Sequence, residues 1–138
     1  MTTANSHRLS DALRACARGI HPLEAGVGLL IDCGSWLHRD DFTSRFITTG
    51  TSISDGTTVL AATDWEAAIA ALHAGELPAS GGERRMLLLA ASIAGGIPVS
   101  LYDTLPGIDR RNASLVAGAV AHAAGHADLE TDKKYLNG

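Results

Sequence analysis

Residues 80–96, SGGERRMLLLAASIAGG, carry a helix start, an apolar centre and a helix stop within one stretch. Ser80 and Glu83 match the capping-box pattern, in which two side chains satisfy the free backbone N–H groups at a helix start. Gly95-Gly96 follows the apolar run, and glycine suits the position just past a helix end. The stretch therefore predicts a well-defined helix over residues 84–94.

The same signals recur on both sides of this helix. Thr63-Asp64-Trp65-Glu66 matches a second capping box and predicts a helix over 65–74 that ends at Gly75. Asp109 is a suitable N-cap for a long helix beginning at Arg110, and Ser100 for a short helix before it. Apolar residues at helical spacing predict the other helices. Further helices are expected over residues 8–18, 21–33, 40–46, 101–105 and 110–124.

The composition agrees with a mainly α fold, a compact bundle of about five to seven helices. Alanine is frequent and aromatic residues are only 4% of the 138 residues. Residues 47–62, ITTGTSISDGTTVLAA, are the exception, because Thr, Ile and Val favour strands and Asp55-Gly56 is a hairpin signal. We expect one small β-hairpin there, with a loose loop as the alternative.

The length predicts one domain, and the sparse cysteines predict a reducing compartment. We expect a disordered N-terminus over 1–7, a single helical domain over 8–126, and a polar, partly mobile tail over 127–138. The formal net charge is −4, and the sequence offers no signal peptide and no apolar run long enough for a membrane span. Two sparse cysteines fit free thiols. These features favour a cytoplasmic protein without membrane partners.

The stretch Ser80-Gly81-Gly82-Glu83 resembles the signature motif of ABC-type ATPases, which implies contact with a nucleotide phosphate. The resemblance covers about a dozen residues. That family also needs a Gly-rich loop ending in Gly-Lys-Ser or Gly-Lys-Thr, and this chain has no such sequence. The capping box accounts for Ser80 and Glu83 without any ligand.

The order of elements over 83–126 resembles the three-helix core of winged helix-turn-helix regulators. The segment Gly96-Ile97-Pro98-Val99-Ser100-Leu101 would lead into the second helix, and residues 109–112 would begin the recognition helix. The resemblance implies that Arg110, Arg111 and Asn112 contact phosphates or base edges. However, the remainder of the third helix, ASLVAGAVAHAA, is apolar nearly all round, so we expect it to be buried.

Two sets of side chains could in principle support chemistry. His122 and His126 are four residues apart, a spacing that can hold a metal on one helix face, but Gly125 is expected to end the helix between them. Cys33 and His38 could act as nucleophile and base if they met in space. Neither set is complete, so we assign no catalytic, metal-binding or cofactor-binding residue and no cofactor.

We therefore expect a small, non-catalytic protein-interaction or regulatory module. Gly/Ala-rich helix faces let helices approach closely, either within the core or in a homodimer; they comprise Gly26 and Gly28, and Ala117, Gly118 and Ala121. A winged-helix-like DNA-binding regulator, with its helices within 83–124, is the alternative, and a small enzyme is the third class. Paired arginines near helix N-termini are electrostatically unfavourable unless something compensates them, and an exposed tryptophan often marks an interface. The candidate partner or nucleic-acid contacts are Arg84, Arg85, Arg110, Arg111, Asn112 and Trp36.

Overall fold

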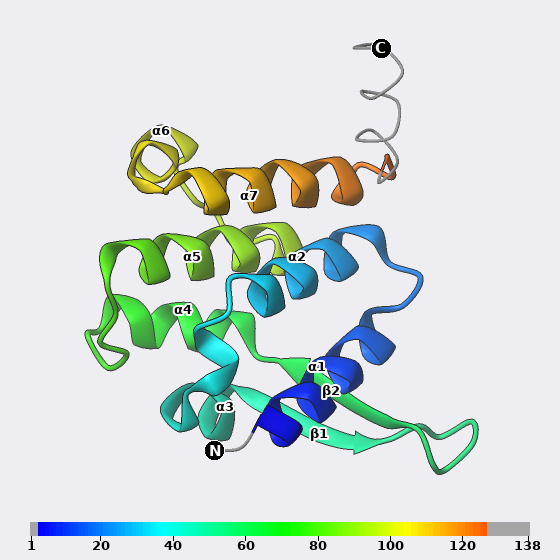
Figure 1. The fold of residues 1–138 in the computed structure, drawn as a ribbon. Coiled ribbons are helices and arrows are strands. Elements are labelled where there is room, and N and C mark those ends of the chain that lie inside the picture. The colour runs from blue at the N-terminus through cyan, green and yellow to red at the C-terminus, as the bar shows by residue number, and fades with distance from the viewer. Residues whose placement is uncertain (1–2, 127–138) are drawn as a thin grey trace.

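A computed structural model describes residues 3–126, and helix α5, Gly81–Gly95, lies at its centre (Figure 1). The predicted capping box is present. The Ser80 N–H donates to Glu83 Oε1 at 3.0 Å, and the Glu83 N–H donates to Ser80 Oγ at 3.2 Å. Gly96, with a φ of 69°, ends the helix in the left-handed region. The helix buries its apolar side, including Met86, Leu87 and Ala90.

The helices stack in layers around α5 (Figure 1). Helix α2, His21–Asp32, lies beside α5, and α4, Trp65–His73, packs on α5 from the other side. The last helix, α7, Arg110–Ala123, covers α2 and α5 from outside. This outer position leaves much of α7 in contact with solvent.

The contact between α2 and α5 depends on one glycine. A Cβ atom built on Gly26 would lie 2.3 Å from Ala94 Cβ and 2.8 Å from the Ala90 carbonyl oxygen. No real Cβ approaches other atoms so closely, so the two backbones touch where Gly26 has no side chain. Gly26 therefore allows two helices to pack closely within the core.

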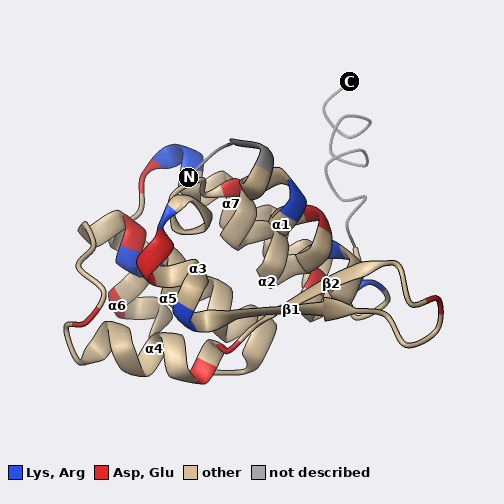
Figure 2. Cartoon of the chain, turned by 90° about the horizontal axis from the view of Figure 1, so that it is seen from below, with Lys and Arg blue, Asp and Glu red and all other residues tan. Residues whose placement is uncertain are grey.

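The N-terminal half combines α1, Thr3–Ala17, with a short 3-10 helix, η1, Trp36–His38, and α3, Asp40–Phe46. The expected hairpin follows: β1, Ile47–Thr51, pairs antiparallel with β2, Val59–Thr63. It packs against α1, and its loop protrudes from the helices (Figure 1). Neither strand carries a Lys, Arg, Asp or Glu (Figure 2).

The loop between the strands is held by Asp55. Its Oδ1 accepts from the Thr57 and Thr58 N–H groups at 2.9 Å each, and its Oδ2 accepts from the Thr58 hydroxyl. These bonds stabilise the ionised carboxylate and lower the pKa of Asp55 to about 2, with the Thr58 hydroxyl as the largest contributor. Gly56 supplies the positive φ, 68°, that the Asp-Gly signal predicted.

A short helix, α6, Leu101–Thr104, and a 3-10 turn, η2, Leu105–Gly107, precede α7. The predicted caps are both present. The Ser100 hydroxyl accepts from the Asp103 N–H at 3.2 Å, and Asp109 Oδ1 accepts from the Asn112 N–H at 2.7 Å. The mainly α fold with one small hairpin is therefore confirmed, with seven α-helices over residues 3–126. None of these helices has the length and apolar character needed to cross a bilayer.

Three expectations need correction, and the first concerns the N-terminus. Residues 3–7, which we expected to be disordered, belong to α1. Ser6 is only 6% exposed, and its Oγ lies 3.1 Å from His38 Nδ1. This distant partner, 32 residues away, could not be read from the local pattern. The tail expected over 127–138 lies outside the described residues.

The second correction concerns the start of α4. The N-cap is Asp64, whose Oδ1 accepts from the Ala67 N–H at 3.1 Å, and the predicted Thr63 is the last residue of β2. The Thr63 hydroxyl is buried without a hydrogen-bond partner. Thr63 belongs to β2 because its backbone pairs with Ile47 of β1.

The third correction concerns α7, which we expected to be buried. Only Val116 and Ala119 are buried along its 14 residues. The helix is apolar because it is rich in alanine, and alanine leaves little area to bury. Composition therefore overstated how deeply this helix enters the core.

Candidate functional site

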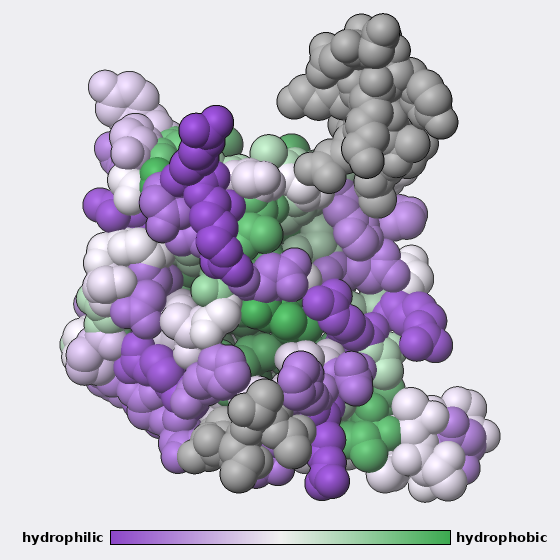
Figure 3. All heavy atoms as spheres, in the orientation of Figure 1, coloured by the Kyte–Doolittle hydropathy of each residue, from purple (hydrophilic) through white to green (hydrophobic). Residues whose placement is uncertain are grey.

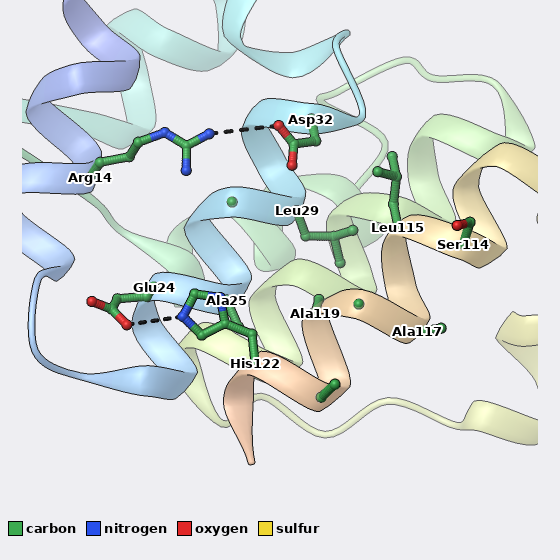
Figure 4. A pocket seen from close by; sticks show the side chains of 13 residues that line it. Arg14, Glu24, Ala25, Leu29, Asp32, Ser114, Leu115, Ala117, Ala119 and His122 are labelled. Carbon is green, nitrogen blue, oxygen red and sulfur yellow. Dashed lines mark hydrogen bonds and ion pairs between the residues drawn. The ribbon is translucent and has the colours of Figure 1, made fainter. Parts of the chain in front are cut away.

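A groove of about 580 Å³ lies between α2 and α7, with α1 along one side (Figure 4). Its volume is within the range of about 300–1,000 Å³ that is usual for ligand pockets. The groove is partly open to solvent. Its lining comes from α1 (Arg14), α2 (Glu24, Ala25, Gly28, Leu29, Asp32) and α7 (Ser114, Leu115, Ala117, Gly118, Ala119, Ala121, His122).

Small residues keep this groove open. A Cβ on Gly28 would find only Arg14 Nη1, at 3.9 Å, and a Cβ on Gly118 would have no atom within 4 Å. Gly26, two positions earlier and on the opposite side of α2, packs against α5 instead. The two glycines of α2 thus have different roles: Gly26 allows α2 to pack closely on α5, and Gly28 lines the groove.

Charged residues stand at one end of the groove. Arg14 Nη2 lies 3.6 Å from Asp32 Oδ1, and both side chains are about half exposed, so this ion pair is weak. Arg111 Nη2 donates to the backbone carbonyl of Asp32 at 2.8 Å. This bond fixes the first turn of α7 against the last residue of α2.

The other end holds two histidines and a glutamate. His122 Nε2, in the last turn of α7, lies 3.0 Å from Glu24 Oε1, in the first turn of α2 (Figure 4). His21 Nδ1 lies 3.5 Å from the same Glu24 oxygen. The hydrogen bond from His122, followed by one from the Gly19 N–H, lowers the pKa of Glu24.

This cluster differs from the histidine pair considered in the sequence. Gly125, with a φ of 87°, ends α7 as expected and separates His126 from the helical face of His122. His122 instead meets a residue 98 positions earlier in the chain. His21 and Glu24 were missed, because their spacing of three residues shows a shared helix face and gives no sign of what lies opposite.

Three of the four paired arginines donate hydrogen bonds to backbone carbonyls of this chain. Arg84 Nη1 donates to the carbonyl of Leu72, in the last turn of α4, at 3.2 Å, and Arg85 Nη1 donates to Gly107 O at 3.2 Å. Arg111 bonds the end of α2 in the same way. A positive charge is unfavourable near a helix start and favourable near free carbonyl groups, as at a helix end. The carbonyl groups that these three arginines contact therefore compensate for their unfavourable positions.

Arg110 and Asn112 lie beside Arg111 and differ from it. Arg110 is exposed and has no hydrogen-bond or ion-pair partner among residues 3–126. Asn112 is half-buried, and its Oδ1 is buried without a hydrogen-bond partner. Arg110 is thus the member of the two arginine pairs that is free to contact another molecule.

Trp36 is a core residue, which corrects its inclusion among the candidate contacts. Its side chain is fully buried, and Nε1–H donates to Glu83 O at 2.9 Å. Its ring packs on Phe42 at a centroid distance of 5.2 Å. Trp36 therefore anchors the core and is not available to a partner at the surface.

The Cys33 and His38 side chains are engaged elsewhere. The Cys33 thiol donates to Leu30 O at 3.2 Å, and His38 Nδ1 lies 3.1 Å from the Ser6 hydroxyl. Burial raises the pKa of the Cys33 thiol, which disfavours the nucleophilic thiolate. This geometry gives no support to a cysteine nucleophile.

Apolar side chains also reach the outer surface near α7. Leu101 and Val120 are about half exposed, and Tyr102 is 90% exposed. In the space-filling view, apolar surface lies in hollows between hydrophilic side chains (Figure 3). Comparison with protein-family models, curated proteins and solved structures finds no match for this chain.

Proposed function

We propose that the chain is a small, non-catalytic protein-interaction module whose contact surface is the outward stripe of α7. Ala113, Ala117 and Val120 lie on this stripe and are exposed. Their spacing of four and three residues places them on one helix face. Val116 and Ala119, at other positions around the helix, are buried in the core. An exposed apolar stripe on an otherwise anchored helix is the observation that carries the proposal.

The occupant we propose for this stripe is a second copy of the chain. In a two-fold symmetric contact, each residue lies near its own counterpart, so charges on the surface would repel. The run from Asn112 to Ala121 contains no ionisable side chain. Ala117 also lines the groove, and the neighbouring Gly118 has open space on the groove side, so no side chain crowds this edge of the stripe.

Helix α6 extends this surface. It lies beside the N-terminal end of α7 in the same outer layer (Figure 1). Tyr102 and Leu101 project from it and are 90% and 55% exposed. Tyrosine is common among residues that dominate binding energy at interfaces. Together, α6 and α7 offer exposed aromatic and apolar side chains on neighbouring helices.

Analytical ultracentrifugation of the wild-type chain and of Ala117→Glu and Ala117→Lys tests this proposal. We expect a wild-type dimer at micromolar concentrations, and a loss of affinity of at least about tenfold for each variant alone, because like charges would face each other. Mixing the two variants should restore dimers. Ala70→Glu, an exposed alanine of α4, is the matched control.

A wild-type chain that stays monomeric up to hundreds of micromolar would rule out the second copy as occupant. Equal effects of Ala117→Glu and Ala70→Glu on dimer affinity would show that the interface does not lie on α7. Restoration by the mixed variants is the sharpest result, since only a contact between copies of Ala117 predicts it.

A winged-helix-like DNA-binding regulator is the second candidate. The exposure of α7 and the free side chain of Arg110 favour it. Arg84, Arg85 and Arg111 favour it less, because each donates to a backbone carbonyl of this chain. Fluorescence anisotropy with a labelled duplex would support this candidate if affinity fell steeply with salt and Arg110→Ala weakened binding.

A further inference from the structure

The cluster at the end of the groove brings three metal-ligating atoms together. One ligand atom each of His21, Glu24 and His122, an imidazole nitrogen or a carboxylate oxygen, lies within 4.8 Å of the other two. His21 is the first residue of α2, Glu24 follows one turn later, and His122 comes from the last turn of α7. The ring centroids of the two histidines are 6.1 Å apart. Two elements distant in sequence thus present two imidazoles and one carboxylate to a shared point.

The spacing suits a small transition-metal ion. Ligand bonds of about 2.0–2.1 Å in a tetrahedral site place neighbouring ligand atoms roughly 3.3 Å apart. Glu24 Oε1 lies 3.5 Å from His21 Nδ1 and 3.0 Å from His122 Nε2. The two histidine nitrogens need only small rotations of partly exposed side chains to complete the set.

The carboxylate is already oriented by a second contact. Glu24 Oε2 accepts from the Gly19 N–H at 3.0 Å, which leaves Oε1 directed toward both imidazoles. Hydrogen bonds of this kind hold metal ligands in position in known sites. His21 lies close to the turn that ends α7, since a Cβ on Gly125 would be 3.9 Å from His21 Cδ2.

We propose that His21, Glu24 and His122 bind one divalent transition-metal ion of the zinc class. Imidazole nitrogens favour zinc, cobalt, nickel and copper over magnesium and calcium. Three protein ligands leave a fourth position open to solvent or to a molecule in the groove. The side chains of His21, His122 and Glu24 are 62%, 37% and 27% exposed, so the ion can enter from solvent.

A bound ion would also cross-link the fold. It would join the start of α2 to the end of α7, opposite the end where Arg111 bonds Asp32. Because the unfolded chain does not hold these ligands together, metal binding should stabilise the folded chain. Thermal unfolding therefore provides a readout that is independent of direct binding.

Calorimetric titration of untagged protein with zinc chloride tests the proposal. We expect one ion per chain and a loss of affinity of at least about tenfold for His21→Ala, Glu24→Gln and His122→Ala. His7→Ala is the matched control, because His7 is exposed on α1 and lies outside the cluster. Cobalt(II) should show the intense visible absorption of a low-coordinate site in the wild type and in the control.

Zinc should raise the melting temperature of the wild type and of His7→Ala, and a chelator should reverse the rise. The isosteric Glu24→Gln keeps the shape of the side chain, and circular dichroism checks that each variant is folded. Absence of stoichiometric binding to the wild type would overturn the proposal. So would equal zinc affinity in the control and in all three cluster variants, which would leave the cluster as an ordinary hydrogen-bonded ion pair.

Discussion

The guanidinium of Arg111, in the first turn of α7, donates to the carbonyl of Asp32, the last residue of α2, at 2.8 Å. At the opposite end of the same two helices, His122 meets Glu24 at 3.0 Å. The helices therefore run antiparallel, and each end of α7 is bonded to the complementary end of α2. A cation at the start of one helix is placed beside the carbonyl-rich end of its neighbour.

Arg111→Ala should lower the free energy of unfolding by about 1 kcal/mol, because it removes a charged donor from a helix C-terminus. Arg110→Ala, at the adjacent position, should change it by less than about 0.5 kcal/mol. Urea denaturation of both variants measures the difference. Equal destabilisation would mean that the bond to Asp32 contributes no net stability.

Gly26→Ala should destabilise the chain by about 3 kcal/mol, because the new methyl group would overlap Ala94 Cβ and the Ala90 carbonyl. Because two of the new methyl group's closest contacts would be to the backbone of α5, α2 and α5 would have to move apart, which would open the centre of the core. Thermal and urea unfolding measure this loss. A variant as stable as the wild type would show that the two helices do not touch at Gly26.

Gly28→Ala, two residues along the same helix, should instead stabilise the chain by about 0.5–1 kcal/mol. Its new methyl group would meet only Arg14 Nη1, at 3.9 Å, in the groove. The pair of variants separates the effect of space from the effect of helix propensity. Urea unfolding curves of both variants, measured at equal protein concentration, give the sign of each change in the free energy of unfolding.

The start of α4 gives a test of the corrected cap. Asp64→Ala should cost about 1 kcal/mol, because its carboxylate accepts the Ala67 N–H. Thr63→Val should be neutral or stabilising, because the buried Thr63 hydroxyl has no partner to lose. If the capping box began at Thr63 instead, chemical denaturation would show the opposite order.

The hairpin loop should depend on pH through Asp55. The folded pKa of about 2 is below the usual value of 3.8, so ionised Asp55 stabilises the loop above pH 3.8. This stabilisation is lost as the pH falls from about 4 to below 2. Amide NMR signals of Thr57 and Thr58 should shift over that range. In Asp55→Asn, the shift tied to this carboxylate should vanish.

Much of the secondary structure could be predicted because its signals are local. The Ser80–Glu83 box, the caps at Ser100 and Asp109, and the Asp55-Gly56 turn each depend on residues within four positions of one another. Physical rules for such short ranges do not require the fold to be known. All of these features are present as expected.

Errors arose where a distant residue decided the outcome. The helix at the N-terminus extends to Thr3 while Ser6 contacts His38, and Thr63 was taken into the strand opposite Ile47. The composition of α7 predicted burial, but its alanine content measures helix propensity as well as apolar area. A local pattern cannot show whether alanine is present for helix propensity or for burial.

The groove was the least predictable feature. Its two ends pair Arg111 with Asp32 and His122 with Glu24, which are 79 and 98 residues apart. Nothing in either segment indicates the other. The small residues that line it were noticed in the sequence, but only the structure separates Gly26, which packs inside, from Gly28, which faces the groove.

The outer position of α7 also has a consequence for the order of events during protein synthesis. Helices α2 and α5 are complete before α7 leaves the ribosome, yet α7 covers one side of both in the described part of the chain. The nascent chain must therefore expose this apolar side until the last helix arrives. Chaperone binding to nascent chains should consequently fall once residues 110–123 have emerged.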